Sequence, residues 1–114
     1  MARMTKKLQK QIMEWTNVCF RQALLEEYPE FFAQWTETAK KDTYNMKSLL
    51  WQAGLPINST SINDRYLSHL LKLSGDQLSL IVEADQKGHV KRSPVTIHAI
   101  LDEMLHRSAR GQYD

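Results

Sequence analysis

Apolar residues recur every three or four positions along much of the chain, which is the spacing that places side chains on one stripe of an α-helix. The pattern predicts a first, long helix over residues 5–28. Pro29 interrupts it and predicts the start of a second helix, because proline suits the first helical turn. The apolar positions of these two segments are Leu8, Ile12, Trp15, Cys19, Leu24, Leu25, Phe31, Phe32 and Trp35.

The middle of the chain carries a shorter helical pattern, followed by residues typical of a loop. Gly54 is placed to end a third helix, because glycine accepts the left-handed cap conformation without strain. Residues 55–61 contain Pro56 and several side chains that compete for backbone hydrogen bonds, so they form the predicted connector. The shared apolar face of the third helix consists of Met46, Leu49, Leu50 and Ala53.

Capping residues mark the helices in the second half of the chain. Asn63 predicts the N-terminus of a fourth helix that runs to Leu73. Ser74, followed three residues later by Gln77, has the spelling of a capping box and predicts a fifth helix. Gly88 is the expected end of that helix.

A last helix is indicated by Ser93 and Pro94, with serine as the cap and proline at the first helical position. No alternating strand pattern extends beyond a few residues. The predicted fold class is therefore all-α, with several helices in a single domain over residues 1–114. Its predicted parts are N-terminal helices at 1–54, a connector at 55–61 and a second helical region at 62–110.

Composition agrees with a folded protein in a reducing compartment. Apolar residues make up 42% and charged residues 25% of the chain, which is too apolar for intrinsic disorder. Cys19 is the only cysteine, so the chain cannot form an internal disulfide or supply a thiol-rich zinc site. No apolar run approaches the roughly 18 residues that span a bilayer, and the charged N-terminus lacks the apolar core of a secretion signal. We expect a cytoplasmic protein without membrane contact.

Catalytic and metal-binding patterns are missing from the sequence. We find no nucleophile elbow, glycine-rich phosphate loop or catalytic-cysteine signature. His98 and His106 lie two helical turns apart, more than roughly 10 Å, so they cannot bind one ion together. Adjacent carboxylates such as Glu26 and Glu27 point to different faces of a helix, which predicts solvated surface. We therefore expect a non-enzymatic protein with no cofactor and no metal.

A basic segment precedes the last predicted helix. The net charge of the whole chain is only +2, which does not by itself indicate a polyanionic partner. Basic side chains beside a helix N-terminus nevertheless predict phosphate contact, since the free amides there attract anions. The break at 87–93 is longer than the turn of a helix-turn-helix motif, so base reading is not predicted. The alternative is a solvated turn. The candidate DNA-binding residues are Lys87, His89, Lys91 and Arg92.

Between residues 62 and 101 the order of residue types resembles FlhD, the helical subunit of the FlhD/FlhC transcription activator of enterobacteria. The resemblance covers about a third of the chain. His89 stands where the family has a cysteine that can link two subunits, so that covalent link is not available. The shared positions are Ile62, Asn63, Asp64, Leu70, Leu73, Ser74, Gln77, Leu78, Ile81, Glu83, Ala84, Asp85, Gln86, Arg92, Thr96, Ile97 and Leu101.

The resemblance implies an interlocked homodimer that acts with an FlhC-like subunit, which carries the zinc and much of the DNA contact. Promoter DNA would be bound through the complex, and RNA polymerase is a further candidate partner. FlhD-like activators also occur on conjugative elements, and the prediction includes that branch. Another class stays open, namely a small helical interaction module or inhibitor from a phage or mobile element, with no DNA contact. The predicted partner interface consists of Ile12, Trp15, Cys19, Phe31, Phe32 and Trp35.

Overall fold

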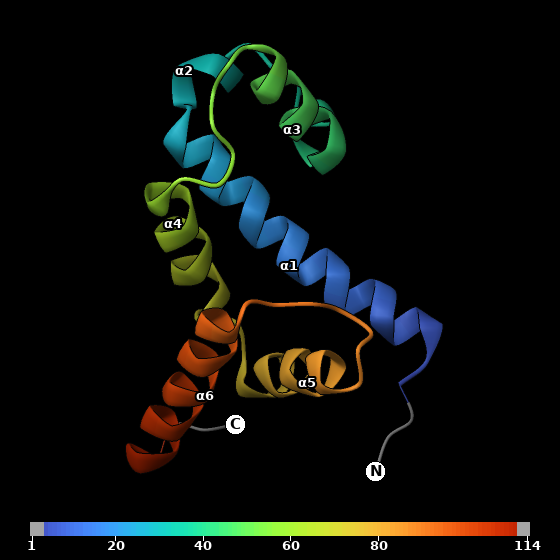
Figure 1. The fold of residues 1–114 in the computed structure, drawn as a ribbon, viewed down its shortest axis with the longest axis vertical. Helices are drawn as coiled ribbons and strands as arrows, with labels where there is room; N and C mark the ends of the chain where they lie inside the picture. Colours follow the sequence, from blue (N-terminus) through green and yellow to red (C-terminus); the bar gives the residue numbers. More distant parts are fainter. Residues whose placement is uncertain (1–3, 112–114) are drawn as a thin grey trace. The chain divides into compact units, whose positions relative to one another are not determined.

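The structure is a computed structural model that describes residues 4–111 (Figure 1). Within this range the chain forms six α-helices, one short 3₁₀ helix and no strand, which confirms the all-α prediction. The elements are α1 (Lys6–Glu27), α2 (Pro29–Phe32), the 3₁₀ helix η1 (Ala39–Lys41), α3 (Thr43–Gln52), α4 (Thr60–Leu70), α5 (Gly75–Gln86) and α6 (Pro94–Ala109).

Contacts divide the described chain into two compact units. The first combines the chain up to Trp15 with the chain from Leu71 onward, and the second is Thr16–Leu70. Helix α1 therefore contributes to both units. These boundaries do not coincide with the predicted connector at 55–61, and the prediction of a single domain stays a prediction.

The core of the second unit is built from α1, α2, α3 and α4. Phe32 is central to it, with its ring centroid 5.0 Å from that of Phe31 and 4.8 Å from that of Trp35. Both ring pairs meet edge to face, which is the favourable arrangement for aromatic quadrupoles. The buried cluster consists of Ala23, Leu24, Phe32, Met46, Leu50 and Ile62.

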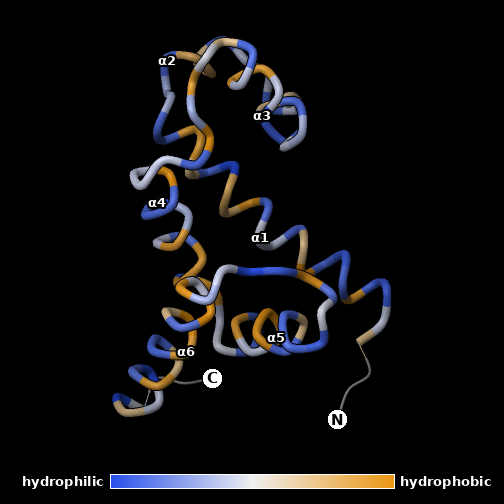
Figure 2. The backbone as a smooth tube through the Cα atoms, viewed as in Figure 1, coloured by the Kyte–Doolittle hydropathy of each residue, from blue (hydrophilic) through white to orange (hydrophobic). Residues whose placement is uncertain are grey.

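The first unit buries one face of α5 against its neighbours. Figure 2 shows apolar and polar stretches following one another along this helix, as expected when one face is buried and the other is solvated. The buried apolar residues of the unit are Met4, Ile12, Leu78, Ile81, Val82, Ala84, Val90 and Ile100.

The predicted caps of α5 and α6 are confirmed. The Ser74 hydroxyl accepts from the Gln77 amide at 3.1 Å, and the Gln77 side chain accepts from the Ser74 amide at 3.1 Å. Ser93 accepts from the Thr96 amide at 3.1 Å, with Pro94 at the first helical position. Satisfying these otherwise unpaired donors fixes where each helix begins.

Three predicted helix boundaries are wrong. α4 begins at Thr60, before Asn63, because Ser59 is a competent cap whose hydroxyl accepts from the Ile62 amide at 3.2 Å. This earlier start places Ile62 in the first helical turn, where it is fully buried. α4 also ends at Leu70 rather than Leu73. Helix α2 begins at Pro29 as predicted but ends at Phe32, so Trp35 lies in the turn that follows.

Arg107 of α6 holds the segment between α4 and α5. Its guanidinium donates to the carbonyl oxygen of Leu73 at 2.8 Å and to that of Leu71. Glu103, one helical turn earlier, accepts from Arg107 Nε at 2.9 Å. A planar guanidinium can serve these acceptors together because its N–H groups point in several fixed directions.

Candidate functional site

The bend between α5 and α6 has a defined shape. Gly88 adopts φ +75°, a conformation that glycine accepts without strain, and the His89 amide donates to the Ala84 carbonyl at 2.9 Å. Val90 is buried. Because Val90 is held inward, its neighbours His89 and Lys91 are placed on the exposed side of the bend.

Asp85 fixes the second half of the bend. Its carboxylate accepts from the backbone amide of Arg92 at 2.9 Å, seven residues away in sequence. The Arg92 guanidinium donates to the Lys91 carbonyl at 2.8 Å, and the Arg92 residue is half-buried. Arg92 therefore contributes to the shape of the bend, whereas Lys91 presents its charge to solvent.

The positive charge that this bend offers to an anion is lower than its basic residues suggest. The Lys87 ammonium lies 3.7 Å from the Glu83 carboxylate, one turn back on α5. At the start of α6, Pro94 has no amide hydrogen and the Thr96 amide is bonded to Ser93. These two features remove anion-binding donors that a helix N-terminus would otherwise offer. The structure brings His89 and Lys91 to one exposed turn, with Lys87 and Arg92 engaged by neighbouring groups.

Half of the predicted partner-interface residues lie inside the chain. Ile12, Cys19 and Phe32 are buried, so they form part of the chain's own packing. Burial also raises the pKa of the Cys19 thiol, which keeps it in the poorly reactive protonated form. The remaining three, Trp15, Phe31 and Trp35, are half-buried.

Other apolar side chains are exposed instead, and the sequence prediction missed them. Tyr44 and Trp51 lie two helical turns apart on α3, opposite the buried Met46 and Leu50. This i, i+7 pair was visible in the sequence as a second aromatic face on an already amphipathic helix. The large exposed apolar residues within the described range are Met13, Val18, Tyr44, Trp51, Val95, Leu101 and Leu105.

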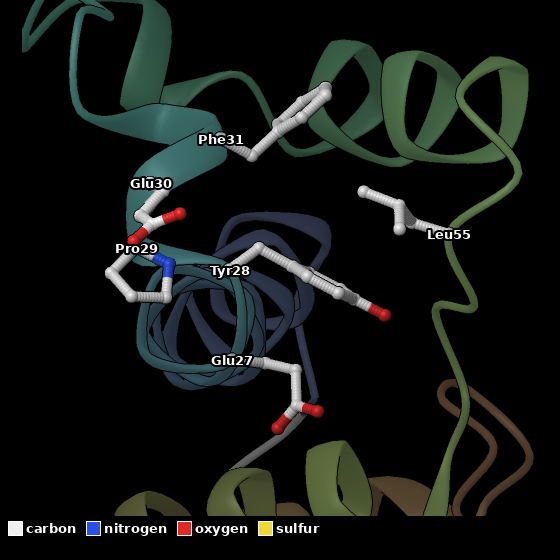
Figure 3. A pocket seen from close by; sticks show the side chains of 6 residues that line it. All are labelled: Glu27, Tyr28, Pro29, Glu30, Phe31 and Leu55. Atoms are coloured by element: carbon white, nitrogen blue, oxygen red, sulfur yellow. The ribbon is translucent and has the colours of Figure 1, made fainter.

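A pocket of about 380 Å³ opens beside the end of α1. Figure 3 shows Tyr28, Phe31 and Leu55 around a common space, whereas Glu27 points away from Phe31 and Leu55. The Tyr28 hydroxyl donates to the Pro56 carbonyl at 2.6 Å. Partial burial, and secondarily the Glu27 carboxylate, raise the pKa of Tyr28, so it acts here as a neutral donor that anchors the connector. The pocket lining combines apolar side chains with the carboxylates of Glu27 and Glu30.

A second pocket, of about 360 Å³, lies directly beside the basic bend. Its walls combine apolar side chains of α6 with the two residues that shape the bend. It therefore offers apolar surface next to the exposed Lys91. The lining residues are Asp85, Arg92, Pro94, Ile97, His98 and Leu101.

Within residues 4–111 no three His, Cys, Asp or Glu side chains come together in an arrangement that could hold a metal ion. Among the helices of the described range, none combines the length and apolar character that a membrane span requires.

Comparison with known protein families, with curated proteins and with solved structures finds no match to this chain. The FlhD-like identity therefore stays a prediction that depends on the shared residue order alone.

Glu26 is exposed, as expected, and Glu27 is half-buried, and both carboxylates contact α4. The Ser61 hydroxyl donates to Glu27 at 2.6 Å, and Arg65 Nε donates to the same oxygen at 3.1 Å. His69 Nε2 lies 2.7 Å from the Glu26 carboxylate. The sequence could not show this, because the partners of Glu26 and Glu27 are more than thirty residues away.

We predict that the Glu27 carboxylate stabilises the fold at neutral pH and that this stabilisation is lost at acid pH. The Ser61 hydrogen bond, with a smaller contribution from Arg65, lowers the pKa of Glu27 below its ordinary 4.5, although partial burial acts in the opposite sense. A depressed folded-state pKa stabilises the fold above the unfolded-state value, and this stabilisation is lost as the pH falls through the folded-state value. Glu27→Gln should therefore lower the urea midpoint at neutral pH, and the difference should close below pH 4.5.

The matched control is Glu30→Gln, an exposed carboxylate on the adjacent α2. It should leave the urea midpoint close to that of the unmodified chain at both pH values. If Glu27→Gln lowers the urea midpoint by the same amount at neutral and at strongly acidic pH, the prediction is wrong. The lost stability would then not come from an ionised carboxylate.

Proposed function

We propose that this chain is a non-enzymatic, cytoplasmic subunit of a hetero-oligomeric transcription activator. It acts as a homodimer of interlocked helices together with an FlhC-like, zinc-containing subunit at promoter DNA. The observation that carries this proposal is the fixed bend at 87–93, which presents His89 and Lys91 outward beside α6. The residue order shared with FlhD over 62–101 supports the choice of partner.

The bend supplies auxiliary phosphate contact rather than sequence recognition. One exposed lysine, one imidazole and a lysine shared with Glu83 neutralise few phosphates. Each phosphate contact changes the slope of log affinity against log salt by only about 0.9. Contacts to phosphate position a protein on DNA but do not read bases. Specific binding therefore requires the FlhC-like subunit, and RNA polymerase is a further partner of the assembled complex.

Lys91→Glu is the direct test of the phosphate contact. The chain, co-expressed with an FlhC-like protein, is titrated against a short fluorescent DNA duplex at several salt concentrations, with binding followed by anisotropy. We expect weaker binding by the variant complex and a salt slope smaller by about 1, because one phosphate contact is lost. The loss should be similar for specific and unrelated sequences, since the contact carries no base information.

Lys72→Glu is the matched control, because Lys72 is an exposed lysine outside the bend. It should leave the salt slope unchanged. If Lys91→Glu and Lys72→Glu bind DNA equally well, the bend is not part of the DNA interface. If the unmodified chain forms no complex with an FlhC-like protein and no complex with DNA, the activator proposal itself fails.

A second candidate function is supported by a different observation. The exposed rings of Tyr44 and Trp51 on α3 are the kind of surface that protein interfaces use as anchors. A small helical interaction module or inhibitor, from a phage or mobile element, would use such a face without touching DNA. Retention of a protein partner by the unmodified chain, with no DNA binding by the chain or its complex, would favour this second function.

A further inference from the structure

The outer face of α3 is unusually apolar for a surface helix. Tyr44 is 83% exposed and Trp51 is 75% exposed. Together with Ile57 they line a shallow pocket of about 300 Å³. Met46 and Leu50, on the opposite side of α3, are the face that the helix buries within its own unit. The outer face therefore remains available to another chain.

The charge on this face is positive. Lys47 lies between the two rings along the helix, and α3 contains no acidic residue. Its ammonium is placed 4.9 Å from the centroid of the Phe20 ring, a cation–π contact that orients it while the residue stays exposed. Asp42, just before α3, is engaged as the helix cap through the Asn45 amide. A partner for this face should offer apolar side chains with a carboxylate beside them.

The outer face of α6 has that chemistry. Leu101 is 45% exposed and Leu105 is 72% exposed, and they lie one turn apart on the same side of the helix. Asp102, adjacent to Leu101, has 67% of its side chain exposed. His98 Nε2, one turn earlier on α6, lies 3.4 Å from this carboxylate. This face therefore pairs two leucines with an exposed carboxylate.

We propose that the outer face of α3 in one copy binds the outer face of α6 in a second copy of this chain. Leu101 and Leu105, about 6 Å apart along their axis, fit between Tyr44 and Trp51, about 10 Å apart along theirs. Lys47 then faces Asp102. The inference rests on the homodimer of the proposed function and identifies the surfaces that form it.

Charge and symmetry favour a second copy as the occupant. Each chain carries an aromatic face with Lys47 on α3 and a leucine face with Asp102 on α6. In the proposed dimer, each copy contributes both faces, so that the contact is made twice. This repetition doubles the buried area, which helps to reach the roughly 1,200 Å² of a specific interface. A single contact would leave one apolar face of each copy exposed to solvent.

Charge reversal with mixing is the decisive experiment. Lys47→Glu and Asp102→Lys are each expected to shift the full chain from dimer to monomer in size-exclusion chromatography with light scattering. The dimer dissociation constant should rise roughly tenfold or more, because like charges meet twice per dimer. An equimolar mixture of the two variants should regain the dimer mass. In the mixed dimer the two reversed charges, at positions 47 and 102, attract each other in one contact, and the other contact is native. The double variant should also dimerise.

Matched controls are Lys72→Glu and Asp64→Lys, which reverse exposed charges on other surfaces and should stay dimeric. Circular dichroism verifies that every variant is folded. A chain that is monomeric at all concentrations overturns both this inference and the homodimer. A dimer that survives Lys47→Glu, or single variants that dissociate but are not restored by mixing, overturns only the α3–α6 contact.

An alternative occupant has its own readout. A single-stranded oligonucleotide that quenches tryptophan fluorescence in the unmodified chain but not in Trp51→Ala, with the chain monomeric throughout, would assign the α3 face to nucleic acid and overturn the proposal. The DNA titration of the Lys91→Glu complex tests the proposed function, whereas the dimer mass tests the α3–α6 contact. The failures of the two proposals can therefore be distinguished.

Discussion

Replacing Phe32 with alanine should lower the free energy of unfolding by about 3–5 kcal/mol. Phe32 is 1% exposed and packs edge to face against Phe31 and Trp35. Truncation removes the buried ring and leaves a cavity among side chains from α1, α3 and α4 that can close only in part. The loss is large against the roughly 5–15 kcal/mol that stabilises a small domain. Urea denaturation at low protein concentration measures it.

Tyr44→Ala is the control for this loss, because Tyr44 belongs to the same unit but is exposed. In the monomer it should change the free energy of unfolding by no more than about 0.5 kcal/mol. The pair of variants also tests the predicted partner interface. If Phe32→Ala left the monomer stable and weakened only dimer formation, Phe32 would be a partner-surface residue and its assignment to the core would be wrong.

Replacing Arg107 with methionine should lower the free energy of unfolding by about 3 kcal/mol. Methionine keeps the helix propensity and much of the length of the side chain, so the loss reports the guanidinium. The Arg107 side chain is 14% exposed, and its removal leaves the Leu71 and Leu73 carbonyls without their donor. Glu103 is 26% exposed and can regain water, which keeps the loss below that of a fully buried pair.

Arg110→Met, three residues further along the chain and exposed, is the control and should change stability by about 0.5 kcal/mol or less. Arg107→Lys should recover only part of the loss, because an ammonium cannot reach both carbonyls and Glu103 in the geometry of the guanidinium fork. Thermal unfolding of the unmodified chain and the three variants, followed by circular dichroism, ranks them. Equal effects at positions 107 and 110 would show that the bonds of Arg107 contribute little.

Local signals in the sequence were sufficient to locate most helices. The pairs Ser74–Gln77 and Ser93–Thr96 lie within one helical turn, so their capping geometry depends on neighbouring residues only. The start of α4 was misplaced because Ser59 and Asn63 are both good caps. The choice between them depends on burying Ile62, which is decided by packing across the whole unit.

The candidate site depended more on long-range contacts. Spacing identified the basic bend, but not that Asp85 binds the Arg92 amide and that Glu83 shares Lys87. The amphipathic pattern also could not distinguish an apolar stripe that is buried inside the chain from one that binds a partner. Phe32 and Trp51 are both large aromatics on helical stripes, and only the fold buries the first and exposes the second.

The order of segments in the two compact units has a consequence for biosynthesis. Thr16–Leu70 is continuous, so this part of the polypeptide can collapse as soon as it has left the ribosome. The other unit must join the residues up to Trp15 with those from Leu71 onward, which requires closing a long loop and waiting for the C-terminal helices. Until α5 and α6 are translated, Ile12 has no partners from the second half of its unit, and nascent chains should be most prone to aggregation in that interval.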